Sequence, residues 1–376
     1  MKAINTGNTF QLYDDSVQTY DNLPSGTYSV CFSQNRGFFL EKINNFSITE
    51  KIYGSHQKKV EKVFRTYNMT NRNLGVILSG DKGIGKSLFA KMLCLKGIAE
   101  GLPLIIVDCH ISGIANFINS IEQKCIVLFD EFDKTFCGSN MHKDTMDDPQ
   151  TEMLTLFDGI NTSEKLFIIT CNDINKLSEF LVNRPGRFHY HFRFDYPSAE
   201  EITEYLKDNI DSQFWGEIEN VVSFATKVKL TYDCLRAIAF EINNGETFKS
   251  AIDDLNIINF EMQTYQMEIL FSNGYVLSTS ANFDAFSDRK IDLDLSYKSF
   301  YDILSISFDT SNIQYDKLSG KSYMAEENIR YEWDIEGNGY NEENPTIKDI
   351  LANNVHPEKI VFTRAYKNRQ YQYACI

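Results

Sequence analysis

A glycine-rich octapeptide restricts what this chain can fold into more than any other feature. Residues 80–87 read Gly80-Asp81-Lys82-Gly83-Ile84-Gly85-Lys86-Ser87, the complete G-x-x-x-x-G-K-S pattern of a phosphate-binding loop. The apolar run Gly75–Ser79 before it predicts a strand, and Leu88–Lys96 after it predicts a helix. Glycines let backbone N–H groups approach a phosphate chain, and the helix points the positive end of its dipole at it. The octapeptide therefore predicts an α/β domain that binds a nucleoside triphosphate.

Each part of the octapeptide has an expected role at the triphosphate. Lys86 is predicted to neutralise the β- and γ-phosphates, and the Ser87 hydroxyl is predicted to bind Mg²⁺. The other predicted nucleotide contacts come from the loop and the start of the helix: Gly80, Asp81, Lys82, Gly83, Ile84, Gly85 and Leu88.

Residues 74–196 alternate short apolar runs with stretches of helix length. Most runs are apolar on both faces, which is typical of parallel strands that helices cover on each side. The expected strands are Leu74–Ser79, Leu104–Val107, Cys125–Phe129, Leu166–Thr170 and His189–Phe194. The pattern predicts an α/β fold with a parallel central sheet.

Two acids, Asp130 and Glu131, come directly after the expected strand Cys125–Phe129. An Asp at the end of a strand beside the phosphate loop can orient the magnesium shell, and an adjacent Glu can polarise an attacking water. Alone, two acids after an apolar run are a common strand end. Together with the loop they predict a hydrolytic site, with Asp130 at the metal and Glu131 at the water.

This combination of motifs resembles the AAA+ ATPase family, and two further segments extend the resemblance. The strand Leu166–Thr170 leads to Asn172, in the place of the family's sensor-1 polar residue. Arg184-Pro185-Gly186-Arg187-Phe188 resembles the R-P-G-R-F segment of the classical AAA clade. The resemblance covers residues 50–257, and the two ends of the chain lie outside it.

The resemblance implies a reaction and an assembly. It implies ATP with Mg²⁺ as the bound pair, ATP hydrolysis as the reaction and Asn172 as a catalytic residue. It also implies that Arg184 and Arg187 reach the γ-phosphate held by a neighbouring copy, where guanidinium groups stabilise the charge of phosphoryl transfer. A shared site of this kind requires a homo-oligomer, a hexameric ring as in the family. The alternative for either arginine is an ion pair with a surface acid.

Shorter segments carry weaker resemblances to the family. Tyr53 and Gly54, before a charged helix, are similar to the segment that borders the adenine. Arg236, in a helix that Thr231 is expected to cap, is the candidate sensor-2 arginine, with an ordinary helix-surface charge as the equal alternative. Phe157-Asp158-Gly159-Ile160 is similar to Bcs1-like members, and the β-rich start of the chain is similar to phage-encoded AAA ATPases.

Changes of pattern divide the chain into four predicted domains. Residues 1–50 are expected to form a small β-rich unit that contains a hairpin of Thr27–Ser33 and Phe38–Ile43. Residues 51–197 are the expected ATPase core. Residues 198–258 are a helical lid, which Ser198 and Glu201 open with a capping box. Residues 259–376 are a β-rich C-terminal domain.

Two hairpins are expected in the C-terminal domain. Alternating apolar residues in 267–277 flank Ser272-Asn273-Gly274, which is a turn signal. Residues 360–373 are expected to form a last hairpin around Lys367–Gln370.

Charge and cysteine content indicate which class of partner and which cellular compartment to expect. The chain has 52 acidic and 37 basic residues and a net charge of −15, which disfavours direct binding of nucleic acid. Its 8 cysteines form no C-x-x-C pair, which favours a reducing compartment over a disulfide framework or a zinc site. The sequence shows no secretory signal pattern and no run long enough to span a bilayer. We therefore expect a cytoplasmic protein, in a phage host if the gene is phage-encoded.

The sequence departs from protein-threading AAA relatives in one segment. Ile111–Lys124 leaves room for one short helix and has no aromatic-hydrophobic-glycine pore loop, and Phe117 within it is interpreted as core. The polar stretch Phe136–Gln150 is either a mobile loop facing the ring centre or a plain surface loop. His189 and His191 are interpreted as structural, because a metal site needs more ligands.

The combined prediction is a Mg²⁺-dependent ATPase that forms a ring and remodels a macromolecular partner, most simply a protein. Two alternatives stay open. One is a loader that acts on a DNA replication complex. The other is a scaffold whose assembly is controlled by ATP with little turnover.

Overall fold

The computed structural model divides into two compact units, residues 1–196 and residues 197–376, each described by itself. The structure describes residues 1–6, 9–54, 56–137, 149–158, 164–182, 184–257, 263–284, 290–297, 301–316, 319–333 and 355–364. Three predicted features lie outside the described residues: most of the polar stretch Phe136–Gln150, the pair Gly159-Ile160 and the hairpin around Lys367–Gln370.

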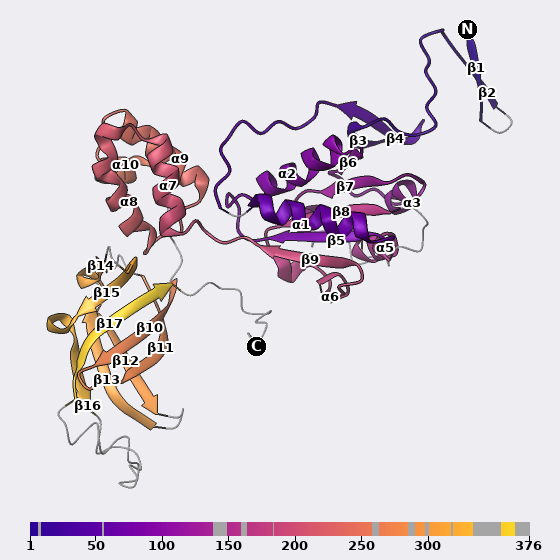
Figure 1. Ribbon diagram of the computed structural model, residues 1–376. Helices are drawn as coiled ribbons and strands as arrows, with labels where there is room; N and C mark the ends of the chain where they lie inside the picture. Colours follow the sequence, from indigo (N-terminus) through magenta and orange to yellow (C-terminus); the bar gives the residue numbers. More distant parts are fainter. Residues whose placement is uncertain are drawn as a thin grey trace. The chain divides into compact units, whose positions relative to one another are not determined.

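A seven-stranded sheet forms the centre of the first unit (Figure 1), in the order β4-β3-β6-β7-β8-β5-β9. Neighbouring strands are parallel except for the antiparallel pair β3–β4. The bounds are β3 Gly26–Ser33, β4 Gly37–Ile43, β5 Leu74–Ser79, β6 Pro103–Val107, β7 Cys125–Phe129, β8 Lys165–Cys171 and β9 Phe188–Arg193. β5, β7 and β8 are buried along their whole length, as expected of strands covered on both faces. The predicted α/β fold with a parallel sheet is confirmed.

Helices cover both faces of this sheet (Figure 1). One face carries α1 (His56–Met69) and α2 (Lys86–Ala99). The other face carries α3 Ile114–Asn119, α4 Phe132–Thr135, α5 Pro149–Phe157 and α6 Glu179–Val182. Side chains alternate along each strand, so that β7 directs Ile126 to the first face and Val127 to the second. The apolar composition of both strand faces is thus explained by two separate cores.

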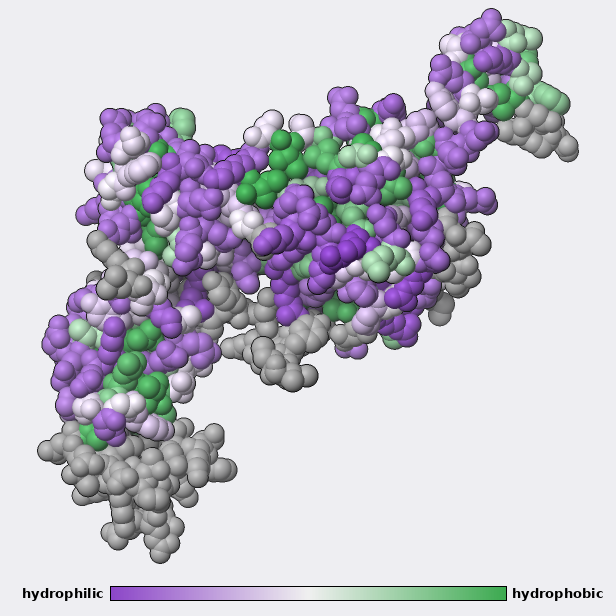
Figure 2. Space-filling view, in the orientation of Figure 1, coloured by the Kyte–Doolittle hydropathy of each residue, from purple (hydrophilic) through white to green (hydrophobic). Residues whose placement is uncertain are grey.

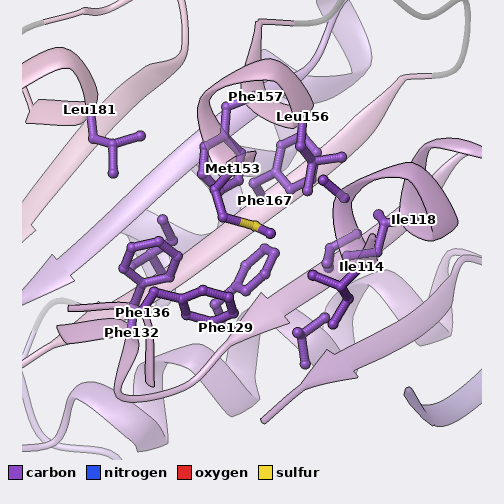
Figure 3. Close-up of a cluster of buried hydrophobic side chains, with 14 of the residues drawn as sticks. Ile114, Ile118, Phe129, Phe132, Phe136, Met153, Leu156, Phe157, Phe167 and Leu181 are labelled. Carbon is purple, nitrogen blue, oxygen red and sulfur yellow. The ribbon is translucent and has the colours of Figure 1, made fainter. Parts of the chain in front are cut away.

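Aromatic side chains fill the core under α4 and α5 (Figure 3). The ring of Phe129, at the end of β7, has its centroid 5.8 Å from that of Phe132, 5.6 Å from that of Phe136 and 5.7 Å from that of Phe157, all edge to face. Edge-to-face contacts at this distance are favourable for aromatic rings. They hold the chain that follows β7 against the sheet, directly beside Asp130 and Glu131.

The sheet begins earlier in the chain than the predicted domain boundary at residue 50. The expected hairpin is present as β3 and β4, but β3 also pairs in parallel with β6, from Gly26 opposite Pro103 to Ser29 opposite Ile106. The hairpin is therefore part of the central sheet and not a separate unit. Period-two alternation identifies a strand but does not identify the strand that it pairs with. Only β1 (Lys2–Thr6) and β2 (Thr9–Tyr13), among the described strands before residue 50, form a sheet of their own.

Helices open the second unit. The expected capping box is confirmed: the Ser198 side chain accepts from the Glu201 N–H, and the Glu201 carboxylate accepts from the Ser198 N–H. The Thr231 hydroxyl caps the next long helix by accepting from the Cys234 N–H. The helices are α7 Ala199–Asn209, η2 Ser212–Glu217, α8 Ile218–Ala225, α9 Tyr232–Asn243 and α10 Phe248–Asp254.

Two antiparallel sheets follow in the second unit, and the predicted turn at Ser272-Asn273-Gly274 joins the first two strands. One sheet has the order β11-β10-β17-β15-β14 and the other β12-β13-β16. Their strands are β10 Gln263–Phe271, β11 Val276–Phe283, β12 Lys290–Tyr297, β13 Tyr301–Asp309, β14 Gln314–Asp316, β15 Lys321–Ala325, β16 Arg330–Trp333 and β17 Pro357–Arg364, with one-turn helices η3 Thr310–Asn312 and η4 Glu326–Asn328. The inward residues of both sheets share one apolar core.

The face drawn in Figure 2 is mostly hydrophilic, in keeping with the high acidic content of the chain. Among the residues that the structure describes, every helix is too short or too polar to cross a bilayer.

Gly75 in β5 provides a test of the packing between β5 and β9. A Cβ at this position would lie 2.4 Å from the Arg187 carbonyl oxygen and 2.9 Å from the Phe188 Cα. Both are backbone atoms that cannot turn away, so Gly75→Ala should lower the free energy of unfolding by about 1–3 kcal/mol. Chemical denaturation measures the change. Gly216→Ala is the matched control, because a Cβ there meets nothing within 4 Å, and equal stability of the two variants would contradict the prediction.

Candidate active site

The phosphate loop connects the end of β5 to the start of α2, as the octapeptide predicts. Gly80, Gly83 and Gly85 have φ values of 143°, 79° and 97°, a region in which side chains other than hydrogen are disfavoured. A Cβ on Gly80 would also lie 2.4 Å from the Phe194 carbonyl oxygen. The loop packs closely against the end of β9 at this point. A Cβ on Gly85, by contrast, would meet nothing within 4 Å.

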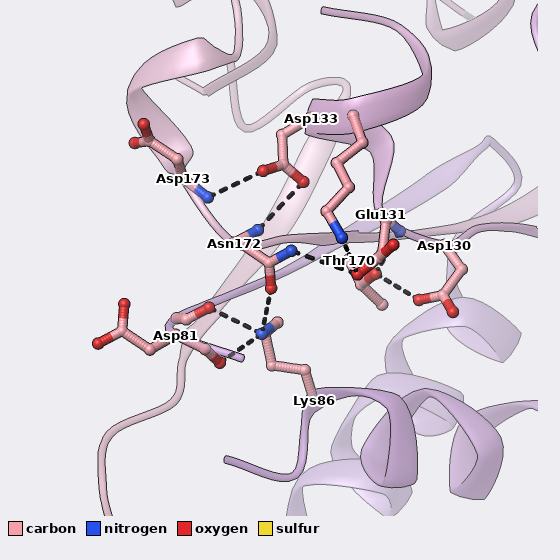
Figure 4. A network of polar contacts seen from close by, with 10 residues as sticks. Asp81, Lys86, Asp130, Glu131, Asp133, Thr170, Asn172 and Asp173 are labelled. Carbon is pink, nitrogen blue, oxygen red and sulfur yellow. Dashed lines mark hydrogen bonds and ion pairs between the residues drawn. The ribbon is translucent and has the colours of Figure 1, made fainter. Parts of the chain in front are cut away.

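The Lys86 side chain lies inside the loop and connects it to β8 (Figure 4). Its ammonium donates to the Gly80 carbonyl at 2.7 Å, to the Asp81 carbonyl at 2.6 Å and to the Asn172 Oδ1 at 2.9 Å. Burial lowers the pKa of this ammonium, while Cys171 and three nearby carboxylates oppose the shift. Lys86 and Asn172, which the sequence proposed from separate motifs, are thus brought into direct contact.

Asp130 and Glu131 follow β7, and Thr170 of β8 orients both. The Thr170 hydroxyl donates to Asp130 Oδ1 at 2.5 Å and accepts from the Glu131 N–H at 2.8 Å. Glu131 has φ 50° and is the one non-glycine residue with positive φ in the described part of the chain. Such a conformation costs free energy and persists where surrounding contacts enforce it, most often at functional sites. Thr170, which sequence reasoning missed, provides one of these contacts.

The Glu131 carboxylate is ionised and held by a neighbouring cation. Lys134 Nζ lies 2.6 Å from Glu131 Oε1, and the Asn172 amide nitrogen lies 3.5 Å from the same oxygen. The hydrogen bond from Lys134 is the main cause that lowers the pKa of Glu131. Asn172 therefore lies between the phosphate-loop lysine and the acid expected to polarise water.

Asp133 is a second residue that sequence reasoning missed. It is buried in the first turn of α4, and its two carboxylate oxygens accept from the backbone N–H groups of Asn172 and Asp173, each at 3.1 Å. These bonds fix the chain as it leaves β8 and so fix where the Asn172 side chain points (Figure 4). The only sequence signal for Asp133 is a further acid three residues after Asp130.

The two predicted arginines have different surroundings within the chain. Arg184 is exposed, and its guanidinium lies 5.6 Å from the centre of the Phe180 ring. Arg187 is 8% exposed and forms a bidentate ion pair with Asp158, just after α5. Within the described residues of one chain, neither arginine is bonded to Lys86 or Glu131. The sequence left open an ion pair with an acid as the alternative to a contact with a neighbouring copy, and Arg187 forms such a pair.

The remaining candidates include residues of both units. Tyr53 is buried, and Gly54 beside it is exposed with φ 79°. Arg236 is exposed on α9, in the second unit. In the loop itself Lys82 and Ser87 are exposed, and the Asp81 carboxylate accepts from the Tyr196 hydroxyl at 2.5 Å.

His191 supports the base of the loop, since its Nε2 lies 2.6 Å from the Ser79 Oγ at the end of β5. Burial, together with Arg193, lowers the pKa of His191 to about 4, so the ring is neutral at physiological pH. His189 on the same strand is exposed. Within the described ranges, no group of three His, Cys, Asp or Glu side chains is arranged to hold a metal ion.

The residues at the loop fit a magnesium nucleotide. Positive-φ glycines and a buried ammonium suit a phosphate chain. Mg²⁺ is bound through one or two protein oxygens together with substrate phosphates and water, and this does not require a complete protein cage. Ser87 and Asp130, both exposed near the loop, are the side chains that would hold it.

The contact between Asp133 and the chain after β8 is testable. Asp133→Asn replaces one acceptor by a donor that faces a backbone N–H, which should cost about 1–3 kcal/mol of folding stability. It should also lower ATP turnover, because Asn172 loses its support, while ATP binding at the loop is kept. Denaturation, nucleotide titration and a turnover assay measure the three effects. Asp173→Asn is the control, since an amide oxygen can still accept from the Asn175 N–H as Asp173 does; equal turnover of both variants would contradict the assignment.

Comparison with known proteins agrees with this geometry. Residues 76–196 match the family described as "ATPase family associated with various cellular activities (AAA)". The match begins in β5 and ends at Tyr196, after β9, and so contains the phosphate loop, both acids, Asn172 and both arginines.

Curated relatives align with between 31% and 38% of the chain. A cell division cycle ATPase of Plasmodium falciparum is 30% identical over 129 residues, which is 31% of this chain and 10% of that protein. The ATP-dependent zinc metalloprotease FtsH 2 of Phytoplasma mali is 26% identical over 145 residues, 35% of this chain and 21% of that protein. Protein mac-1 of Caenorhabditis elegans is 23% identical over 158 residues, 38% of this chain and 19% of that protein.

The chain thus spans about a fifth or less of the length of these relatives. The family uses ATP with Mg²⁺, for which the loop of this chain is suited. Residues 76–196 thus form a domain of the AAA ATPase family, and the curated relatives include proteins that are named as ATPases.

Proposed function

We propose that this chain forms a homo-oligomeric ring, a hexamer, in which each ATP site is completed by a neighbouring copy, and that hydrolysis remodels a protein partner. The observation that carries the proposal is the convergence of Lys86, Asn172 and Glu131 at one edge of the sheet, while Arg184 is exposed elsewhere on the same domain. Within the chain, Arg184 lies over Phe180 and Arg187 is paired with Asp158, and an exposed Arg184 on each copy can reach the site of a neighbouring copy.

Each residue has a defined task in this proposal. Lys86 and the backbone N–H groups of residues 80–88 bind the phosphates, and Ser87 and Asp130 hold Mg²⁺, which neutralises phosphate charge. The ionised Glu131 orients a water and accepts its proton as the water attacks. Asn172 connects Lys86 to Glu131, so that phosphate and water are positioned together. Tyr53 and Gly54 are proposed as contacts to the rest of the nucleotide.

Hydrogen bonds within the domain position the acids of the site. Thr170 and Asp133 hold the chain at Asp130, Glu131 and Asn172 through hydrogen bonds within the domain. Preorganised groups of this kind do not have to be reoriented at the moment of reaction. Glu131 has only to exchange its bond with Lys134 for one with water.

A protein is the proposed partner because the net charge of −15 repels phosphate backbones. The β domain of residues 263–364 lies outside the segment that matches the family, and we propose it, with the strands before residue 50, as the part that selects the partner. We place the activity in the cytoplasm, where cysteines such as Cys94, Cys125 and Cys171, which are free in the structure, stay reduced.

Glu131→Gln tests the hydrolytic assignment. The amide has nearly the same shape but cannot take a proton, so turnover should fall by about 100-fold or more, while ATP binding is kept because the loop is unchanged. Steady-state hydrolysis and binding of a labelled nucleotide measure the two quantities. Lys134→Ala is the companion variant: it frees the carboxylate and should keep most of the turnover. Wild-type turnover in Glu131→Gln would refute the role of Glu131.

Mixing two inactive variants tests whether the site is shared. Lys86→Ala loses the phosphate contact, and Arg184→Ala loses the donated arginine, so each should be inactive alone. In a random equal mixture, about a quarter of the sites combine an intact loop with an intact neighbour, because each condition is met half of the time. ATPase activity should therefore reappear on mixing. Mass photometry shows whether mixed rings form, and mixed rings without any recovered activity would contradict a shared site.

A further inference from the structure

The two arginines of residues 184–187 are separated by two residues but differ in what they contact. Each of the three guanidinium nitrogens of Arg187 donates a hydrogen bond within its own chain: Nε and one terminal nitrogen donate to the two oxygens of Asp158, and the other terminal nitrogen donates to the Phe180 carbonyl at 2.9 Å. Its side chain is 8% exposed, whereas that of Asp158 is 37% exposed. A buried guanidinium with three own-chain bonds is part of the domain interior.

The acceptors of Arg187 belong to two different elements. Asp158 follows the last turn of α5, and its N–H donates to the Leu154 carbonyl, so this carboxylate is attached to a packed helix. Phe180 lies in α6, which has four residues. Arg187 therefore ties α6 to the end of α5, and a helix as short as α6 depends on such contacts for its position.

The Arg184 side chain in turn packs on Phe180. The Phe180 ring is 57% exposed, and the Arg184 guanidinium lies over it, 5.6 Å from its centre. A cation over an aromatic ring is attracted by the ring face. The turn that joins the two arginines is also closed, because the N–H groups of Arg187 and Phe188 both donate to the Arg184 carbonyl, at 2.9 and 3.0 Å.

The backbone of Arg187 is fixed as well. Its carbonyl oxygen would lie 2.4 Å from a Cβ on Gly75, so it packs directly against the backbone of β5. Strand β9 begins at the next residue, Phe188. Arg187 is thus held at its backbone by the sheet and at its side chain by α5, and both constraints lie inside one copy of the chain.

We propose that Arg184 alone enters the neighbouring copy's site and that Arg187, paired with Asp158, is a positioning residue that holds α6 and the turn so that Arg184 points outward. This inference rests on the shared site of the proposed function. It gives the two arginines different roles in that site. It assigns a role to Asp158 and replaces the direct role that the sequence suggested for Arg187.

The test removes the carboxylate and leaves both arginines in place. Asp158→Ala should lower kcat of the assembled protein by about 10²-fold, the order that a misplaced reacting group costs, with KM for ATP little changed because the loop is intact. Arg184→Ala should lower kcat by roughly 10³-fold, the lower end for a donated arginine. The double variant should equal Arg184→Ala, since Asp158 acts only through Arg184.

Four results would overturn the inference. Higher turnover in Asp158→Ala would mean that the released Arg187 acts directly at the neighbouring site. Wild-type turnover would mean that the pair of Arg187 and Asp158 does not position Arg184. If Asp158→Ala lowers kcat in the Arg184→Ala background by the same factor as in the wild type, Asp158 acts independently of Arg184. Unchanged turnover in Arg184→Ala would instead reject the shared site itself, which the Lys86→Ala and Arg184→Ala mixture detects separately.

Two further variants keep the test decisive. Asp158→Asn preserves the shape of the side chain and serves if Asp158→Ala melts below the assay temperature; it should lower kcat in the same direction. Lys124→Ala is the control for loss of an ion pair, because it breaks the pair between the exposed Lys124 and the partly buried Glu164 in the same unit and should leave kcat and assembly unchanged. Thermal melting and mass photometry on every variant confirm that folded, assembled protein is compared.

Discussion

The order of three neighbouring parallel strands places every group of the ATP site. β7, β8 and β5 are adjacent in the sheet and end at the same edge, where ligands bind in open α/β sheets. The phosphate loop follows β5, the two acids follow β7, and Asn172 follows β8. Because β8 lies between the other two, residues at its end contact the groups that follow both: Asn172, just after β8, accepts a hydrogen bond from the Lys86 ammonium, and Thr170 in β8 orients Asp130 and Glu131.

Because polar groups of the site are buried, each of them needs a hydrogen-bond partner within the domain. Lys86, Asp133 and Thr170 are 6%, 3% and 1% exposed, and a buried polar group without a partner is costly. Each of them therefore has a defined set of acceptors or donors in the domain. This network also keeps Glu131 in its left-handed conformation, since the Thr170 hydroxyl accepts its N–H. The same bonds that satisfy buried groups thus position the carboxylate that is proposed to act on water.

Much of the local structure was predictable because it depends on neighbours in the chain. The octapeptide has the glycine conformations that its spacing predicts, and the five expected strands of the ATPase core are present to within one residue at each end. The capping box at Ser198 and the turn at Ser272-Asn273-Gly274 also formed where residue types indicated them. The roles of the site residues stay proposals, but the structure brings Lys86, Asn172 and Glu131 together from three separate motifs.

The sequence alone determined the phosphate loop, the strands and helices of the core and the acids at the end of β7, because hydrogen-bonding type and side-chain periodicity act over a few residues. Only the tertiary structure decided that β3 joins the central sheet beside β6, that Asp133 and Thr170 support the site, and that Arg187 is bound by Asp158 while Arg184 is exposed. Those partners are 29 or more residues apart in the chain. Neither propensity nor periodicity specifies which distant groups meet, since that choice is made by packing of the whole domain.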